Sequence, residues 1–193
     1  NSSSGKMGYY IAKKAIELGA NVSLIIGPTN LPMDLLNIKT IRVEDSEQMY
    51  NETIKLFHKS DVVICSAAIS DFKPVELAQN KIKKENGLDS IKLEPTLDIL
   101  KKLGEIKTSQ YLVGFALETD NIIENAKNKL KSKNLDAIVV NKIGDFNPIS
   151  SDYNQIDFIN SSLNITSFEK KLKSEVSNDI LNQIINNVKE TKD

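Results

Sequence analysis

Residues 111–141, YLVGFALETDNIIENAKNKLKSKNLDAIVVN, contain two apolar runs separated by an amphipathic segment. Tyr111–Leu117 and Ala137–Asn141 are short and rich in apolar residues, which is typical of strands buried in a sheet. Within Asp120–Ser132 the apolar residues return every three or four positions, which indicates a helix. A strand, a helix and a second strand in this order predict two parallel strands joined by a right-handed crossover.

The same alternation continues upstream of this unit. Residues 61–68 form an apolar run that predicts a strand buried on both faces. Ser46 is the expected N-cap of a helix that ends near Lys59, and residues 69–89 lack periodicity, which predicts a long mobile loop. The other elements expected here are helices over residues 5–19 and 97–106, and strands over residues 21–26, 38–43 and 91–93.

The last quarter of the chain has a different pattern. Residues 155–159 and 163–168 predict an antiparallel hairpin, and the apolar stripe from Val176 to Val188 predicts a final helix. We therefore expect an α/β fold with a Rossmann-like, doubly wound, mainly parallel sheet and a C-terminal antiparallel hairpin. One domain is expected to cover residues 1–193.

Composition narrows the functional classes. The 193 residues are 40% hydrophobic, enough for a core that needs no disulfide, and Cys65 is the only cysteine. The net charge is −1, with 24 lysines and one arginine, which disfavours a nucleic-acid or membrane-surface binder. No apolar run approaches the roughly 20 residues that cross a bilayer, so we expect a cytoplasmic protein. Asn1 reads as the middle of a motif, so we expect further sequence upstream.

Three segments fall where doubly wound sheets bind ligands, beyond the carboxyl ends of strands. The turn before the first helix, formed by Ser2, Ser3, Ser4, Gly5 and Lys6, suits a phosphate through its backbone N–H groups; a simple helix cap explains it equally well. Asp71 follows the 61–68 strand and suits a ribose hydroxyl, Mg²⁺ or a turn cap. The lysines of residues 80–84 suit either a solvated surface or a loop that closes over a polyphosphate.

A nicotinamide-dependent oxidoreductase is the principal alternative, because a Gly-x-x-Gly turn into a helix is also half of a dinucleotide fingerprint. The acidic residue expected after the 21–26 strand is replaced by Gly27 and Pro28, which argues against it. A non-enzymatic nucleotide-binding module is the second alternative.

Several motifs together closely resemble one family, the phosphopantothenate–cysteine ligases, also called phosphopantothenoylcysteine synthetases. The resemblance covers about residues 1–190. The motifs keep the family's order and spacing: NSSSGKMG (1–8), GANVSLIIGP (19–28), AAISDF (67–72), NKIKK (80–84), VGFALET (113–119), KNLD (133–136) and VNK (140–142).

The resemblance implies a step of coenzyme A synthesis. The carboxylate of 4′-phosphopantothenate attacks the α-phosphorus of CTP, pyrophosphate leaves, and the acyl-cytidylate then reacts with the amine of cysteine to release CMP. It implies Mg²⁺ with the nucleotide, and a homodimer with the 155–168 hairpin as a candidate contact. It also implies a strand, a Gly-Gly-Thr turn and an arginine upstream of Asn1, which the printed sequence does not contain. These motifs do not decide whether the nucleotide is CTP or ATP, or whether a decarboxylase is fused upstream.

Residue roles also follow from the resemblance. Asn1 is expected at the activated acyl group and Lys81 on a flap that reaches the phosphates. A non-enzymatic module would not need both residues, so their presence together favours an enzyme. The amino-acid sequence of Glu94–Asp98 departs from the family pattern. The implied nucleotide-binding residues are Cys65, Ser66, Ala67, Asp71, Lys81, Leu97, Asp98, Ile99, Leu100, Phe115, Lys129 and Lys133.

Overall fold

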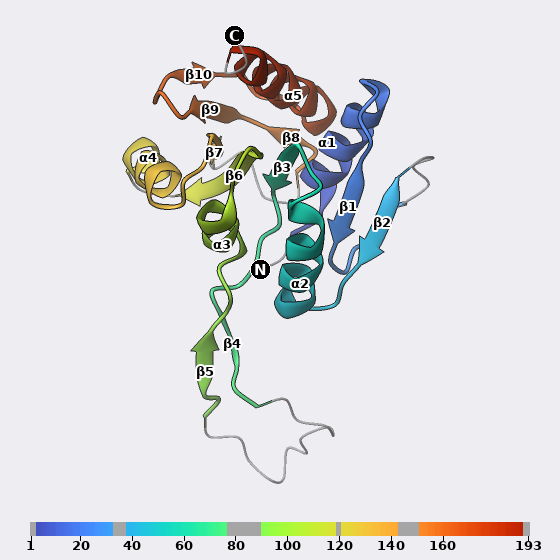
Figure 1. The fold of residues 1–193 in the computed structure, drawn as a ribbon, viewed down its shortest axis with the longest axis vertical. Helices are drawn as coiled ribbons and strands as arrows, with labels where there is room; N and C mark the ends of the chain where they lie inside the picture. Colours follow the sequence, from blue (N-terminus) through green and yellow to red (C-terminus); the bar gives the residue numbers. More distant parts are fainter. Residues whose placement is uncertain (1–2, 33–37, 77–89, 119–120, 143–150, 191–193) are drawn as a thin grey trace.

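The central sheet confirms the strand–helix–strand unit that the sequence predicts over residues 111–141. In the computed structural model, which describes residues 3–32, 38–76, 90–118, 121–142 and 151–190, β6 (Tyr111–Glu118) and β7 (Ala137–Lys142) pair in parallel. Helix α4 (Ile122–Ser132) connects them (Figure 1).

The sheet has five strands in the order β10-β9-β7-β6-β3. Strand β3 (Val62–Cys65) is parallel to β6, whereas β9 (Ile156–Asn160) is antiparallel to both β7 and β10 (Ile165–Ser167). The mainly parallel sheet and the late antiparallel hairpin are therefore both as predicted.

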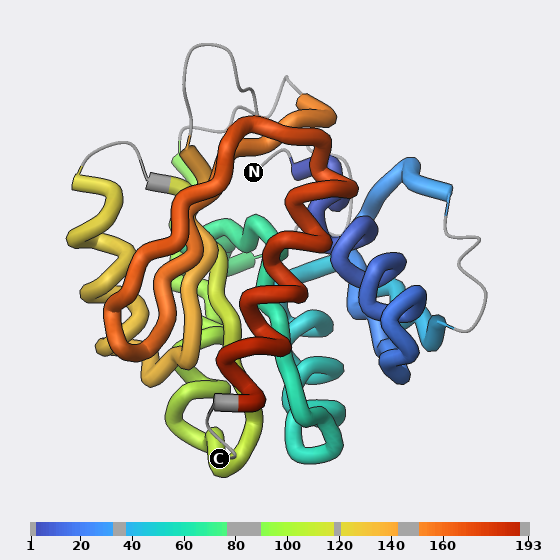
Figure 2. Tube along the Cα trace, turned by 90° about the horizontal axis from the view of Figure 1, so that it is seen from above, coloured from blue at the N-terminus to red at the C-terminus, as the bar shows by residue number. Residues whose placement is uncertain are grey.

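Helices cover both faces of this sheet, as a doubly wound fold requires. Helices α1 (Lys6–Glu17) and α5 (Lys173–Glu190) pack side by side on one face (Figure 2). Helices α2 (Ser46–Phe57) and α3 (Ile99–Ile106) lie with α4 on the other. The sheet has one hydrophobic core on each face, and alternate residues of its strands point into one core or the other. Val113 faces the core under α1 and α5, whereas Leu112 faces the core under α2, α3 and α4.

The parallel sheet is divided between β1 and β3. Strand β1 (Ser23–Ile26) pairs with β2 (Lys39–Arg42) in a separate two-stranded sheet. Because the carbonyls of Val22 and Ile26 accept bonds from the β2 side, the peptide groups of Ser23 and Ile25 point away from β2. On β3, the peptide groups of Val62 and Ile64 point away from β6 by the same reasoning.

Strand β3 is thus an edge strand, and the prediction that residues 61–68 are buried on both faces is wrong. Val62 is 37% exposed, and the other three residues of β3 are half-buried. A continuous apolar run normally indicates a central strand, but among the described residues β3 has a partner on one side alone.

Two short ribbons complete the described structure. The β4–β5 ribbon pairs Phe72–Pro74 with Leu93–Pro95 in antiparallel register and projects from the body (Figure 1). The loop predicted over residues 69–89 is therefore wrong for residues 72–74, and the strand predicted over 91–93 is displaced to Leu93–Pro95. One face of this ribbon is exposed and the other, with Lys73 and Glu94, is half-buried and charged, so no buried apolar face imposes a pattern on its sequence. The second ribbon pairs β8 (Tyr153–Asn154) with β11 (Lys171–Leu172).

Helix α2 begins one residue earlier than its predicted cap would place it. Asp45, not Ser46, is the N-cap, because its side chain accepts a hydrogen bond from the Gln48 N–H at 2.8 Å. Within the described residues, no helix is both long and apolar enough to span a bilayer.

Candidate nucleotide site

The predicted site begins where β3 ends. Ser66 lies against the first turn of α1, close enough that a Cβ on Gly8 would be 3.0 Å from the Ser66 Oγ. The segment that follows is fixed to the base of the β4–β5 ribbon, because Thr96 donates its N–H to the Asp71 carbonyl and its hydroxyl to the Ser70 carbonyl, at 2.9 and 2.6 Å. Asp71 is exposed. Its bonding partner Thr96 is two residues before Asp98 in the sequence, so Asp71 lies near the Asp98 segment.

Asp98 and Lys133 form the central ion pair of this site. One oxygen of the Asp98 carboxylate accepts a hydrogen bond from the Lys101 N–H at 3.0 Å and caps α3. The other lies 2.7 Å from the Lys133 Nζ. Desolvation raises the pKa of Asp98, but these bonds outweigh it and the net pKa is lowered. The carboxylate is therefore ionised at neutral pH and holds Lys133 in place.

Lys129 lies in the last turn of α4, four residues before Lys133, which is the C-cap of that helix. Its Nζ donates to the Phe115 carbonyl at 3.3 Å, and it is close enough to Asp98 to lower the pKa of that carboxyl. The Phe115 side chain packs on the opposite face, against the core under α1 and α5, while its carbonyl accepts this bond from Lys129. The two lysines thus belong to one cluster.

Cys65 adjoins the same ion pair, as a half-buried thiol at the end of β3. Desolvation and the nearby Asp98 carboxylate raise the pKa of the thiol to about 12, and Lys133 opposes this shift. The thiol therefore stays protonated at neutral pH and is not a nucleophile.

The remaining residues of the 97–100 segment have different environments. Leu97 is exposed, whereas the side chains of Ile99 and Leu100 are buried in the core beneath α3. The side chains of Ile99 and Leu100 are therefore unavailable to a ligand, and any contact there would involve their backbone groups. Ala67 is exposed at the end of β3.

The predicted phosphate loop is described only in part. The Ser3 and Ser4 hydroxyls accept long hydrogen bonds, both 3.4 Å, from the N–H groups of Gly5 and Lys6. Lys6 forms an ion pair with Asp152 at 2.5 Å; this bond raises the pKa of Lys6 and lowers that of Asp152. Asn1, Ser2 and Lys81 lie outside the described residues.

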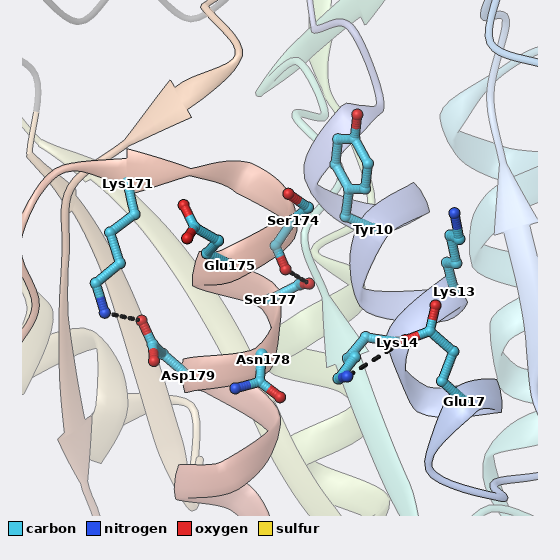
Figure 3. Close-up of a pocket in the computed structure, with 10 residues that line it drawn as sticks. All are labelled: Tyr10, Lys13, Lys14, Glu17, Lys171, Ser174, Glu175, Ser177, Asn178 and Asp179. Atoms are coloured by element: carbon cyan, nitrogen blue, oxygen red, sulfur yellow. Dashed lines mark hydrogen bonds and ion pairs between the residues drawn. The ribbon is translucent and has the colours of Figure 1, made fainter.

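A hollow of about 520 Å³ opens elsewhere, between α1 and the start of α5 (Figure 3). Two of its lysines are paired with carboxylates, Lys14 with Glu17 at 3.2 Å and Lys171 with Asp179 at 2.9 Å. None of the ten residues that line it belongs to the predicted site.

The sequence did not predict a role for two residues next to Lys133. These are Gly104 on α3, which packs against the Lys133 backbone, and Asn134, which follows Lys133 in the chain. The Asn134 side chain donates to the Gly104 carbonyl at 2.9 Å. The available signal was the position of Asn134, since asparagine directly after a helix often adopts a left-handed conformation.

Comparison with known proteins gives a consistent set of relatives. The family described as DNA/pantothenate metabolism flavoprotein C-terminal domain matches residues 1–188. The chain is 42% identical over 187 residues to a protein of an unknown prokaryotic organism named cysteine/cysteine sulfinic acid decarboxylase, covering 96% of this chain and 52% of that protein.

It is also 44% identical over 143 residues to the coenzyme A biosynthesis bifunctional protein CoaBC of Bacillus subtilis (strain 168), covering 74% of this chain and 35% of that protein. The chain thus spans about half, or less, of the length of these relatives. Among solved structures, the crystal structure of the C-terminal domain of coenzyme A biosynthesis bifunctional protein CoaBC has a TM-score of 0.83 and 37% identity, covering 100% of this chain and 86% of that one.

Proposed function

The chain belongs to the family of DNA/pantothenate metabolism flavoprotein C-terminal domains, and from this premise we propose that it is a phosphopantothenate–cysteine ligase domain of coenzyme A biosynthesis. The observation that carries the proposal is the extent of the family match, which includes every element around the Asp98–Lys133 pair. The relative named as a decarboxylase is about twice as long as the matched segment, so its name does not assign decarboxylation to this part.

The proposed reaction brings three anions together: a carboxylate, a triphosphate and the phosphate of the substrate. Catalysis therefore depends on neutralising charge and on holding the reactants in line. A carboxylate oxygen of 4′-phosphopantothenate bonds to the α-phosphorus of CTP as the bond to pyrophosphate breaks. The cysteine amine then attacks the acyl carbon, loses a proton, and CMP leaves with the electron pair.

The chain's own residues serve the nucleotide half of this reaction. Lys129 and Lys133 supply positive charge, and a lysine ammonium has three donors, so Lys133 retains two for phosphate oxygens when one is used by Asp98. Backbone groups at the same end of the sheet are available from Ser66, Ala67, Leu97, Ile99 and Leu100. Asn1 would hold the acyl oxygen and Lys81 the phosphates, as the family resemblance implies.

The residues present also suit Mg²⁺ that arrives with the nucleotide. Among the described residues, no three His, Cys, Asp or Glu side chains cluster as a metal cage. Mg²⁺ is commonly held by one or two carboxylates together with substrate phosphates, and the exposed Asp71 fits that mode. When bound, the ion would neutralise charge on the triphosphate.

The ligase proposal predicts pyrophosphate release that requires all substrates. The full-length polypeptide would be mixed with 4′-phosphopantothenate, cysteine, Mg²⁺ and either CTP or ATP. We expect CTP to give faster release than ATP, and omission of 4′-phosphopantothenate to abolish it. Pyrophosphate release independent of 4′-phosphopantothenate, or no release with either nucleotide, would overturn the proposal.

We also propose that the protein is a cytoplasmic homodimer. The late hairpin offers the open edge of β10, where Ile165 is 43% exposed. The β4–β5 ribbon offers a larger apolar surface, since Phe72 and Leu93 are each 59% exposed, and an isolated two-stranded ribbon is marginal in water. The ribbon is therefore the stronger candidate for the contact.

Light scattering should give twice the mass of one polypeptide. Phe72→Lys on the ribbon should shift the protein to the monomer, whereas Ile165→Lys on β10 should leave the dimer intact. The reverse pattern would assign the contact to the late hairpin, and a monomeric parent protein would exclude the dimer.

A further inference from the structure

The end of α4 is fixed by a well-defined backbone motif. The Leu135 N–H donates to the Leu130 carbonyl at 2.9 Å, and the Asn134 N–H donates to the Lys131 carbonyl at 3.2 Å. Asn134 has a φ of +51°, and Leu130 and Leu135 are both buried in the same core. These are the features of a Schellman motif, in which glycine is the usual left-handed residue.

Asparagine at this position adds something that glycine lacks. The Asn134 side-chain amide donates to the Gly104 carbonyl of α3 at 2.9 Å. Gly104 lies in the last turn of α3, where helix carbonyls lack partners within the helix. Asn134 therefore ends its own helix and caps the neighbouring one.

Gly104 makes this approach of the two helices close. A Cβ built on Gly104 would lie 1.9 Å from the Lys133 carbonyl oxygen, which belongs to the backbone and has no rotamer to change. The backbone of Lys133 is thus packed directly on α3. From there its side chain runs along α3 to the Asp98 carboxylate at the other end of the same helix.

We propose that Asn134 and Gly104 are positioning residues for Lys133, which they fix for contact with the nucleotide phosphates; the inference rests on the proposed ligase function. Lys133 is held at both ends, its backbone by Gly104 and Asn134 and its Nζ by Asp98. Lysine loses much rotamer freedom when it is ordered, so a side chain ordered in advance binds an anion with a smaller entropic penalty.

The proposal explains the Lys-Asn-Leu-Asp motif at residues 133–136 as one unit. Lys133 supplies the charge, Asn134 the bond between helices, and Leu135 the buried anchor. Asp136 ties the unit to the sheet, because its carboxylate accepts the Leu112 N–H at 2.7 Å and pairs with Lys107 at 3.0 Å.

Asn134→Gly is the informative substitution, because glycine retains the left-handed turn and removes only the side-chain bond to Gly104. In the full-length protein we expect KM for CTP to rise about 3- to 10-fold, the range that loss of one hydrogen bond gives. We expect kcat at saturating CTP and KM for cysteine to stay within about twofold of the parent protein, since the bond acts on nucleotide binding alone.

Asn128→Gly is the matched control, since Asn128 is exposed on the same helix and the same substitution there weakens α4 without touching the contact with α3. Its KM for CTP should match that of the parent protein. An unchanged KM for CTP in Asn134→Gly, or an equal rise in Asn128→Gly, would overturn the positioning role and leave Asn134 as a stability residue.

Failure of the ligase proposal would be distinguishable. If the parent protein released no pyrophosphate, the affinity of CTP with Mg²⁺ would be compared by titration calorimetry in the parent and both variants. A weaker affinity in Asn134→Gly alone would support the positioning role without the ligase activity. Absence of CTP binding by the parent protein would overturn both proposals.

Discussion

Replacement of Lys81 by glutamine should lower kcat of the ligase reaction by about 10²- to 10³-fold, the loss that follows removal of one group that stabilises developing charge. Lys81 is the flap lysine by family resemblance, and the triphosphate gains negative charge on its leaving group as the acyl-nucleotide forms. Glutamine is one atom shorter than lysine and retains a hydrogen-bond donor, but it removes the positive charge. Steady-state pyrophosphate release at saturating substrates measures the effect.

Lys84→Gln is the control for Lys81→Gln, because it removes the same charge from the same lysine-rich stretch. We expect a change in kcat of less than about tenfold there, since a general electrostatic effect of one charge in water is screened by salt. Equal losses in both variants would contradict a specific role for Lys81 and would favour a diffuse charge effect of residues 80–84.

Among glycine-to-alanine substitutions at the described glycines, Gly104→Ala should produce the largest steric loss of stability. The new Cβ would lie 1.9 Å from the Lys133 carbonyl oxygen, closer than the other glycines come to any atom. Overpacking of this kind costs about 1–3 kcal/mol and sometimes more. Alanine is favoured over glycine within a helix by roughly 1 kcal/mol, so a net decrease in the free energy of unfolding isolates the clash.

Urea denaturation followed by circular dichroism measures this change, with Gly27→Ala as the control. No heavy atom lies within 4 Å of a Cβ at Gly27, so that variant should stay within about 0.5 kcal/mol of the parent protein. Gly104→Ala should also raise KM for CTP in the fraction that stays folded, because α4 must move away from α3 and take Lys133 with it. An unfolding free energy equal to that of Gly27→Ala would show that the α3–α4 contact yields without cost.

The sequence predicts the parts of the fold in which burial is one-sided or complete. The unit β6–α4–β7 and the apolar stripe of α5 were predicted because their buried positions carry apolar residues at the spacing of a strand or a helix. Strand β4 was missed because Phe72 is exposed and neither face of the ribbon is a buried apolar one. Strand β3 was placed in the interior because its apolar run is the pattern of a central strand, and its position at an edge depends on pairing that composition does not encode.

For the site, motif resemblance identified Asp98 and Lys133 separately, and the structure adds that they bind each other. That pairing depends on how α3 and α4 pack. The packing in turn depends on Gly104 and Asn134, which lie 30 residues apart and have no periodic signature. Contacts between helices set by a single missing side chain are invisible to hydrophobic patterning, because the pattern records which face is buried and not how closely two backbones approach.

The division of the parallel sheet also has a consequence for handling residues 1–193 in isolation. The outward peptide groups of Ser23 and Ile25 on β1, and of Val62 and Ile64 on β3, form two rows on largely apolar strands, and no described strand pairs with either row. Open edges of this kind pair readily with other chains, and neither row has a lysine or a proline within its strand to discourage this. The same strands that support the site are therefore the places where isolated molecules would begin to aggregate as their concentration rises.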